Sequence, residues 1–326
     1  MRKNLFVSIL IPTRNEEKFI SRCLDSIKNQ DYPAEKMEVF VIDGMSTDAT
    51  REIAKKYPFF LVDNLKRFFP AALNIGIKMA KGDIIIILGC HAKYPNDYVR
   101  KSVFFLEKYG ADNIGGVLRA VPFNSGIVAN GIALCLSSFF GAASSFRLGT
   151  KKFKEVDTVF GGCYRRELFD KIGIFNEKLK RSTDMEFNLR LKKAGGKIIL
   201  TPEMTLCYYP SGNLKDFFIH NFIDGVWAVY PLKFVKTPLR FRHYVPLLFV
   251  SALIVSLILK LFFHRVEIIF LIIVLLYAFL NLACSFFISI KNNLKYLFVM
   301  PLIFAVRHIG YGLGSLWGLV KLIFGY

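Results

Sequence analysis

The sequence contains few cysteines and few acidic residues. Six Cys in 326 residues are too sparse for a small disulfide-bonded scaffold, and no two of them have CxxC spacing, so all six are expected to be structural or incidental. Asp and Glu number 25 against 44 Lys and Arg, which leaves a formal charge of +19. The chain is nevertheless 53% hydrophobic and contains 33 Phe, a composition that excludes intrinsic disorder. A nucleic-acid binder would have the charge without this hydrophobicity, so nucleic acid is not an expected partner.

Charge and hydrophobicity are segregated along the chain. Residues 245–326 contain six basic residues and one acidic residue, so most of the positive charge lies in residues 1–244. The last quarter has three long apolar stretches, predicted to be transmembrane segments, at residues 245–263, 266–290 and 296–324. The third has Arg307 and His308 in its middle, and both a single helix with a buried arginine and a re-entrant pair fit it. Buried helices of a soluble protein are the alternative, which two consecutive runs of this length disfavour.

Basic residues flank the predicted spans. They are Lys233, Lys236, Arg240 and Arg242 before the first span, and Lys291 and Lys295 between the second and third. Because basic flanks stay on the cytoplasmic side of a membrane, residues 1–213 are predicted to form a cytoplasmic domain. Residues 214–244 mix Phe, Trp and Tyr with Lys, which is typical of a bridge in the lipid headgroup layer, although an amphipathic helix packed on the soluble domain has the same pattern. No signal peptide is expected, because the first apolar run ends at Pro12.

The first domain alternates short apolar runs with helical patterns. The apolar runs lie at residues 5–11, 39–42, 59–62 and 84–88, and the helical patterns at 16–29, 48–56 and 71–80. This alternation predicts an α/β fold with a Rossmann-like, doubly wound and mostly parallel sheet. Ligands of such sheets bind beyond the carboxyl ends of the strands, which here means residues 12–16, 43–48 and 89–91. No Walker motif or GxGxxG occurs at the first turn, so the P-loop and dinucleotide templates are excluded.

Polar residues follow the first two predicted strands. The first is followed by Pro-Thr-Arg-Asn-Glu at residues 12–16, and the second by Asp-Gly-Met-Ser-Thr-Asp-Ala-Thr at residues 43–50. An acidic residue at a strand end is able to accept a hydrogen bond from a ribose hydroxyl or a base N–H. Ser46 or Asp48 has an alternative role as a cap of the following helix. Together, at adjacent strand ends, these residues favour a nucleotide site.

Several segments resemble family 2 glycosyltransferases with the GT-A fold. They are IPTRNEE, VIDGMSTDATREIA, AALNIGIKMAKGDIIIIL, VFGGCYRRELFDKIGIFNEKL and DMEFNLRLKKAGGKIILTPE, while HAKYPNDY and FRHYVPLLFV resemble the membrane-anchored, succinoglycan-biosynthesis-type branch. The resemblance covers roughly residues 5–250 and implies a nucleotide-sugar donor, usually a UDP-sugar. It implies that Thr13 and Glu16 line the nucleoside pocket, that Asp43 contacts the base and that Ser46 lies nearby.

A predicted helix beginning near residue 183 carries the candidate catalytic residue. Thr183 and Glu186 have capping-box spacing, which places Asp184 in the first turn, and Glu186 and Arg190 are expected to pair at i,i+4. The resemblance implies that Asp184 is the general base of an inverting, hexosyltransferase-type reaction and takes the proton from the acceptor hydroxyl. A helix-start acid is the alternative. The family usually has Glu before this Asp, where this chain has Thr183.

The chain departs from the family pattern at Gly89. The resemblance implies an Asp at this position, which begins a DxD-like motif that holds Mg²⁺ or Mn²⁺ against the donor diphosphate. His91 is the remaining candidate ligand, and one imidazole is a poor Mg²⁺ site. Three alternatives follow. The divalent cation is held through His91, the diphosphate and water; or basic residues, with Lys66, Arg67 and Lys93 as candidates, replace the cation; or transfer activity is lost. A packed, neutral histidine is the structural alternative for His91.

The expected function is transfer of a sugar from a nucleotide-sugar to a lipid-linked saccharide acceptor in polysaccharide or glycan synthesis. The protein is predicted to be a multi-pass protein of the cell membrane, with its basic surface facing anionic lipid. Transfer to polyprenyl phosphate itself is one alternative. A catalytically impaired module for nucleotide binding or assembly is another, and Gly89 is its positive support. Residues 126–147 are predicted to be a loop or helix near the acceptor site rather than a fourth span.

Overall fold

The computed structural model describes residues 5–142, 144–233 and 241–324, with the side chains of residues 241 and 242 left out. The chain divides into two compact units. The sheet unit comprises residues 1–119 and 144–208, and the helical unit comprises residues 120–143 and 209–326. The roles predicted for residues 1–213, 214–244 and 245–326 stay predictions. Lys236 and Arg240 lie outside the described residues.

The sheet unit is built on a mixed sheet. Its described strands are β1 (Val7–Thr13), β2 (Met37–Asp43), β3 (Phe60–Asp63), β4 (Ile84–Ile87), β5 (Ala92–Lys93), β6 (Asn113–Ala120), β7 (Lys154–Glu155), β8 (Phe160–Arg165) and β9 (Ile198–Tyr208). Their order is β3-β2-β1-β4-β8-β6-β9-β5, and β7 pairs with β9. The four predicted strands are confirmed and run parallel to one another.

The prediction of a mostly parallel sheet is wrong for the other half. β8 runs antiparallel to both β4 and β6, and β9 runs antiparallel to β5 and β7. The chain enters β8 from the opposite end of the sheet, so no βαβ crossover joins it to β4. Glycines interrupt β6 and β8, at Gly115-Gly116 and Gly161-Gly162. Because glycine weakens a strand and packs no side chain, a search for continuous apolar runs misses both strands.

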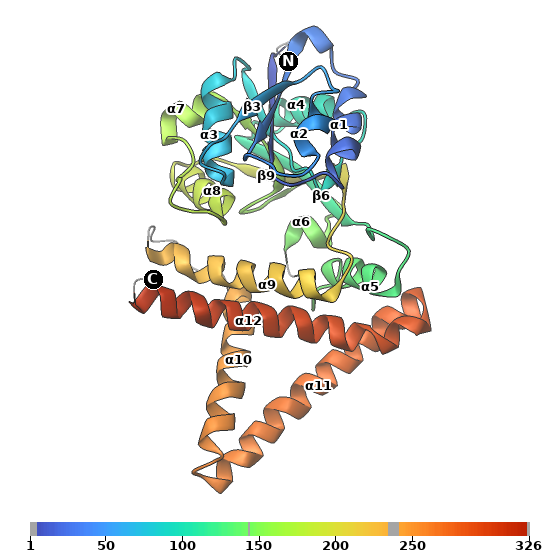
Figure 1. Cartoon of the computed structure of the whole chain (residues 1–326), viewed down its shortest axis with the longest axis vertical. Coiled ribbons are helices and arrows are strands. Elements are labelled where there is room, and N and C mark those ends of the chain that lie inside the picture. Colours follow the sequence, from blue (N-terminus) through green and yellow to red (C-terminus); the bar gives the residue numbers. More distant parts are fainter. Residues whose placement is uncertain (1–4, 143, 234–240, 325–326) are drawn as a thin grey trace. The chain divides into compact units, whose positions relative to one another are not determined.

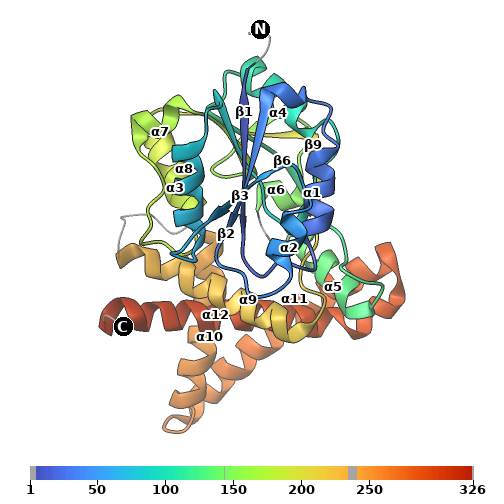
Figure 2. The same ribbon diagram turned by 45° about the horizontal axis from the view of Figure 1, so that its top comes forward.

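Helices cover both faces of the sheet (Figures 1 and 2). They are α1 (Ile20–Lys28), α2 (Thr50–Ala54), α3 (Phe69–Met79), α4 (Tyr98–Lys108), α6 (Ser145–Leu148), α7 (Glu167–Ile172) and α8 (Thr183–Lys193). Successive side chains of β1 enter different cores: Ile9 packs in one core with Leu24 of α1, and Leu10 packs in the other with Leu73 of α3. This two-sided burial explains why the parallel strands are apolar throughout, and it leaves the loops after them at one edge.

The helical unit contains a long hairpin. Its described α-helices are α5 (Ile127–Leu136), α9 (Leu214–Val229), α10 (Phe241–Leu259), α11 (His264–Asn292) and α12 (Met300–Phe324), and α10 and α11 form the hairpin (Figure 1). Among the described residues, α11 is the one helix long and apolar enough to cross a membrane. The apolar part of α10, His243–Leu259, is shorter, and α12 does not meet the same criterion. The predicted span at 266–290 is therefore supported, whereas those at 245–263 and 296–324 are not.

Helix α12 is one continuous helix, so the re-entrant pair considered for residues 296–324 does not form. It packs lengthwise on α9 (Figure 1), and Gly225 and Gly314 allow the two backbones to approach. The guanidinium of Arg307 donates to the carbonyl of Gly141 and to Asn221 Oδ1, at 2.6 Å for the latter. The arginine is thus bonded within the protein, as a charge in an apolar helix requires.

Replacing Gly314 by alanine is expected to destabilise the helical unit by about 1–3 kcal/mol, the usual cost of overpacking. A Cβ at this position would lie 1.9 Å from the backbone oxygen of Phe222, which cannot move without shifting α9. Thermal unfolding of the detergent-solubilised protein measures the effect. Gly310→Ala is the matched control, because its Cβ would lie 3.1 Å from a ring carbon and 3.3 Å from the backbone oxygen of Phe218, contacts that need a shift of only a few tenths of an ångström. Equal melting temperatures for the two variants would contradict the prediction.

Candidate functional site

Four non-glycine residues in the described part of the chain have a positive φ. Asn15, Met45 and Arg67, with φ of 55°, 57° and 63°, lie in the loops that follow β1, β2 and β3. Ser182, with φ of 58°, immediately precedes α8. Such backbone conformations are costly and persist where surrounding contacts enforce them, which happens most often at functional sites. Three of these residues therefore lie at the carboxyl edge of the parallel strands, and the fourth lies at the start of α8.

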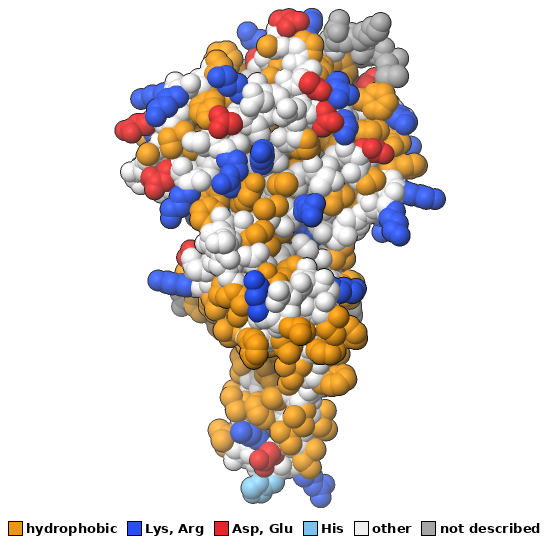
Figure 3. Space-filling model, turned by 90° about the vertical axis from the view of Figure 1, so that its right-hand side faces the viewer, with side chains coloured by type: hydrophobic (Ala, Val, Ile, Leu, Met, Phe, Trp, Pro, Cys, Tyr) orange, Lys and Arg blue, Asp and Glu red, His pale blue; other side chains and the backbone are white. Residues whose placement is uncertain are grey.

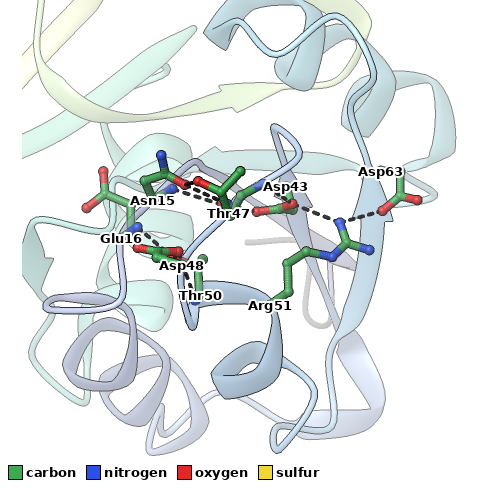
Figure 4. A network of polar contacts seen from close by, with 9 residues as sticks. Asn15, Glu16, Asp43, Thr47, Asp48, Thr50, Arg51 and Asp63 are labelled. Atoms are coloured by element: carbon green, nitrogen blue, oxygen red, sulfur yellow. Dashed lines mark hydrogen bonds and ion pairs between the residues drawn. The ribbon is translucent and has the colours of Figure 1, made fainter.

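The loop after β2 is held by a buried carboxylate (Figure 4). Asp43 is 0% exposed, and its Oδ2 accepts hydrogen bonds from the amide of Ser46 at 2.9 Å and from the Arg51 guanidinium at 2.8 Å. The same guanidinium nitrogen lies 2.7 Å from Asp63 Oδ1 at the end of β3. Hydrogen bonds to Asp43 and then to Asp63 raise the pKa of Arg51. The network therefore ties the ends of two neighbouring strands together.

Ser46 joins this loop to the one after β1. Its hydroxyl donates to Asp43 Oδ1 and accepts from the amide of Asn15 at 2.9 Å. In return, the Asn15 side-chain oxygen accepts from the amide of Thr47 at 2.9 Å (Figure 4). Thr13 lies opposite Asp43 in the β1–β2 register, and its buried Oγ1 has no hydrogen-bond partner among the described residues. The structure thus brings Thr13, Asp43 and Ser46 to one edge, and their contacts with a nucleotide stay predictions.

Asp48 supports the start of α2, the role considered for it from the sequence. Its Oδ1 accepts from the amide of Thr50, the first residue of α2, at 3.0 Å, and its Oδ2 accepts from the amide of Glu17 at 3.2 Å. Burial opposes ionisation, but the hydrogen bonds from Thr50 and Glu17 outweigh it and lower the pKa of Asp48. Ser46 does not share this role, since its hydroxyl bonds Asp43 and Asn15.

Glu16 and His91, assigned to different parts of the site, contact each other. Glu16 Oε2 lies 2.9 Å from His91 Nε2, and the Glu16 amide donates to Thr50 Oγ1 at 2.7 Å. The imidazole also packs on Phe19, with ring centroids 4.1 Å apart. His91 Nδ1 is buried without a hydrogen-bond partner among the described residues, so the ring is neither a simple packed histidine nor fully satisfied.

These residues do not fit a divalent cation held by protein side chains alone. His91 has a buried nitrogen without a partner among the described residues, but Gly89 contributes no carboxylate, and the acidic group in contact with the imidazole is that of Glu16. Across the described residues, no group of three or more His, Cys, Asp or Glu side chains is placed to hold a metal. Mg²⁺ and Mn²⁺ sites are built mostly from several oxygen ligands, whereas this pair offers one carboxylate and one imidazole.

The three basic candidates have different surroundings. Lys66 Nζ lies 2.5 Å from Glu177 Oε2, and this contact is the main cause that lowers the pKa of Glu177. The carbonyl of Arg67 accepts from the Arg14 guanidinium at 3.2 Å, and Lys93 is exposed on β5. Lys66 already has a carboxylate partner, so Arg67, Lys93 and the previously unassigned Arg14 remain as cations for a diphosphate.

Asp184 is the second residue of α8 and is exposed. The predicted capping box does not form, because the helix begins at Thr183 itself, whose hydroxyl donates to the carbonyl of Leu179 at 3.0 Å. The predicted pair of Glu186 and Arg190 is confirmed, with Nε and Oε1 2.6 Å apart. Asp184 Oδ2 accepts from the hydroxyl of Thr158 at 3.3 Å.

The position of Thr158 relates Asp184 to the strand ends. β8 begins two residues after Thr158 and runs antiparallel to β4, with Cys163 opposite Ile86. The start of β8 therefore lies beside the carboxyl end of β4, and a Cβ on Gly89 would touch the Phe160 ring at 3.4 Å. Asp184 is thus bonded to a residue at the edge where the predicted donor loops end.

Sequence reasoning missed Arg51, Asp63 and Thr158 as parts of this edge, and it included Asn15 within residues 12–16 without giving it a role. Asn15 had one usable signal, since asparagine tolerates positive φ better than most residues and follows a strand. No local pattern marks the others, because their partners lie on different elements.

Comparison with known proteins agrees with this architecture. The family model for Glycosyl transferase family 2 matches residues 8–173. A dolichyl N-acetyl-α-D-glucosaminyl phosphate 3-β-D-2,3-diacetamido-2,3-dideoxy-β-D-glucuronosyltransferase of Methanococcus voltae is 33% identical over 224 residues, 65% of this chain and 69% of that protein. The succinoglycan biosynthesis protein ExoA of Rhizobium meliloti is 29% identical over 246 residues, 69% of this chain and 74% of its own length.

One solved structure covers nearly the whole chain. The mannosyltransferase PcManGT from Pyrobaculum calidifontis, in complex with GDP-Man and Mn²⁺, superimposes with a TM-score of 0.59 at 20% identity, over 99% of this chain and 88% of that one. At this identity the likeness shows a common GT-A fold and does not transfer ligands.

Proposed function

The chain belongs to glycosyltransferase family 2, and we propose that it is an inverting enzyme that transfers a sugar from a nucleotide-sugar to a lipid-linked saccharide. The observation that carries the proposal is the contact between Asp184 and Thr158 at the carboxyl edge of β4. This contact places a carboxylate at the edge where the polar strand-end loops lie. A doubly wound sheet binds its ligands at this edge.

Each group at the carboxyl edge of the sheet has one role in the proposed reaction. The loops after β1 and β2, with Thr13, Glu16, Asp43 and Ser46, hold the nucleoside. The acceptor hydroxyl oxygen attacks C1 of the donor sugar, the bond between C1 and the diphosphate oxygen breaks on the opposite side, and Asp184 takes the hydroxyl proton. Proton removal by a positioned carboxylate increases the rate because the acceptor hydroxyl becomes acidic in the transition state. Attack opposite the leaving group inverts the configuration at C1.

The name of the Methanococcus relative states a saccharide carried on dolichyl phosphate, and this chemistry supports a lipid-linked saccharide as the acceptor. The helical unit supports a membrane location: the exposed faces of α10 and α11 are almost continuously hydrophobic, and charged side chains gather at the free end of the hairpin (Figure 3). We propose that this hairpin inserts into the cell membrane and that residues 1–213 lie on the cytoplasmic side. In this arrangement Lys291, in the last turn of α11, and Lys295, just after α11, meet anionic headgroups.

The proposal is tested with the full-length protein in lipid nanodiscs. A panel of UDP- and GDP-sugars is supplied with either a lipid-linked saccharide or polyprenyl phosphate, and the product's anomeric configuration is determined by NMR. Inverted transfer to the saccharide supports the proposal, whereas transfer to polyprenyl phosphate alone indicates the alternative acceptor. Nucleotide binding with no turnover for any pair, with or without Mn²⁺, would indicate a module that binds without catalysis.

Replacing Gly89 by aspartate is expected to lower the Mn²⁺ concentration needed for UDP binding by roughly tenfold, because it adds the missing anionic oxygen ligand near His91. The substitution fits sterically, since the backbone φ of Gly89 is not positive and its Cβ would make an ordinary contact with Phe160. Calorimetric titration of UDP at several Mn²⁺ concentrations measures the change. Gly89→Asn has nearly the same volume without the charge, and an equal response of both variants would contradict a ligand role for position 89.

A further inference from the structure

A chain of side-chain hydrogen bonds leads from the core of the sheet unit to Asp184. Asn113 Nδ2 donates to Asn188 Oδ1 at 3.0 Å, and Asn188 Nδ2 donates to Thr158 Oγ1 at 3.0 Å. Thr158 Oγ1 in turn donates to Asp184 Oδ2 at 3.3 Å. Both asparagines are 0% exposed, while Thr158 is half-buried and Asp184 is exposed. The chain therefore begins at fixed, buried groups and ends at the proposed base.

The direction of each bond follows from the groups themselves. An ionised carboxylate only accepts, and the Thr158 hydroxyl donates its single proton to Asp184 Oδ2. One lone pair of the same hydroxyl accepts from the amide of Asn188, which orients the hydroxyl and leaves its proton for Asp184. The Asn113 side chain then fixes which way the Asn188 amide faces, because the Asn113 N–H donates to the Asn188 oxygen. All three hydrogen bonds thus donate in the direction of Asp184.

The residues of this series of hydrogen bonds come from three separate parts of the sheet unit. Asn113 is the first residue of β6, Thr158 lies just before β8, and Asn188 and Asp184 lie one turn apart on α8. Asn113 also stands opposite Tyr164 in the β6–β8 register. Burial, and then the charge of Asp184, raise the pKa of the Tyr164 phenol, which keeps this neighbour neutral. The bonds therefore fix the start of α8, where Ser182 has its positive φ, against the sheet.

We propose that Asn113, Asn188 and Thr158 are positioning residues that orient the carboxylate of Asp184 toward the acceptor hydroxyl. This inference rests on the proposed role of Asp184 as general base. Oδ2 is held by Thr158, and a defined carboxylate orientation matters because a small misplacement of a catalytic group costs much of the rate. The simpler role for buried asparagines is to stabilise the packing of α8, so the test must separate orientation of the base from stability of the fold.

Thr158→Val is the central variant, because valine has the shape of threonine without its hydroxyl. It is expected to lower kcat on the order of tenfold to a hundredfold, the value of a hydrogen bond to a charged group, with the donor KM nearly unchanged. The melting temperature is expected to fall by a few degrees, because the buried amide of Asn188 loses its acceptor. Thr158→Ser retains the hydroxyl and is expected to recover most of the rate. Thr201→Val is the matched control: Thr201 is also in the sheet unit, is fully buried and accepts from a backbone amide, and its loss should leave kcat unchanged.

A double-variant measurement completes the test. If Thr158 acts through Asp184, adding Thr158→Val to Asp184→Asn causes no further loss of the residual rate. A purely structural role predicts additive losses of rate, and this result would overturn the inference. A wild-type kcat in Thr158→Val, with Asp184→Asn inactive, would also overturn it while leaving the proposed function intact. Full activity of Asp184→Asn would instead remove the proposed base itself.

Discussion

Replacing Asp184 by asparagine is expected to lower the turnover number about 10²–10⁴-fold, the usual contribution of a general base. Asparagine has the shape of aspartate and can still accept from Thr158, but it cannot take a proton from the acceptor hydroxyl. Nucleotide affinity should change little, because the loops after β1 and β2 are held by their own contacts around Asp43. Steady-state transfer assays and UDP calorimetry on the same preparation measure both quantities.

Asp170→Asn is the matched control for this experiment. Asp170 is an exposed acid in the short helix α7 of the same unit, and its replacement removes the same charge at a residue with no proposed role in the reaction. It is expected to retain wild-type turnover. If Asp184→Asn also retains wild-type turnover, Asp184 is a helix-start acid and another group accepts the proton.

Replacing Arg51 by methionine is expected to destabilise the sheet unit by about 3–5 kcal/mol, the usual loss when one partner of a buried ion pair is removed. The carboxylate of Asp43 has no exposure to water, and without the guanidinium it keeps only the donors of Ser46. Methionine retains much of the aliphatic stem of Arg51, so the loss reports mainly on charge. We also expect weaker UDP binding, because the strand-end loop loses its tie to Asp63.

The midpoint of thermal unfolding should fall by roughly 10 °C for Arg51→Met. Arg100→Met is the control, because Arg100 pairs with Asp31 at 2.8 Å at the surface, where both side chains are well exposed. Exposed pairs contribute about 0–1 kcal/mol, so this control should melt within a few degrees of the wild type. Similar midpoints for the two variants would show that Asp43 does not depend on Arg51.

Local sequence patterns were sufficient for the parallel half of the sheet. The apolar runs that became β1, β2 and β4 are buried on both faces, and such runs remain visible whatever lies beside them. The polar residues after β1 and β2, including Thr13 and Ser46, were located because carboxyl ends of parallel strands always share an edge. The antiparallel half was not predicted, because its strands contain glycines and pair with segments far away in the chain.

The membrane region shows where composition misleads. Residues 296–324 were predicted to be a span, yet α12 packs lengthwise on α9 and bonds its central arginine within the protein. The glycines of α12 are visible in the sequence. Their role in helix packing is apparent only in the structure, where the backbone of α9 approaches α12 closely at Gly225. A hydropathy window measures how apolar a segment is and does not measure what covers it.

The sequence alone therefore determined the GT-A type of fold, the segregation of charge from the apolar last quarter, and the edge of the sheet at which polar loops gather. The tertiary structure decided which groups at that edge bond to one another: Asp43 with Arg51, Glu16 with His91, and Asp184 with Thr158. The physical reason is that periodicity reports the burial of each element separately. A hydrogen bond or ion pair between elements depends on their register and packing, which no local stretch of residues specifies.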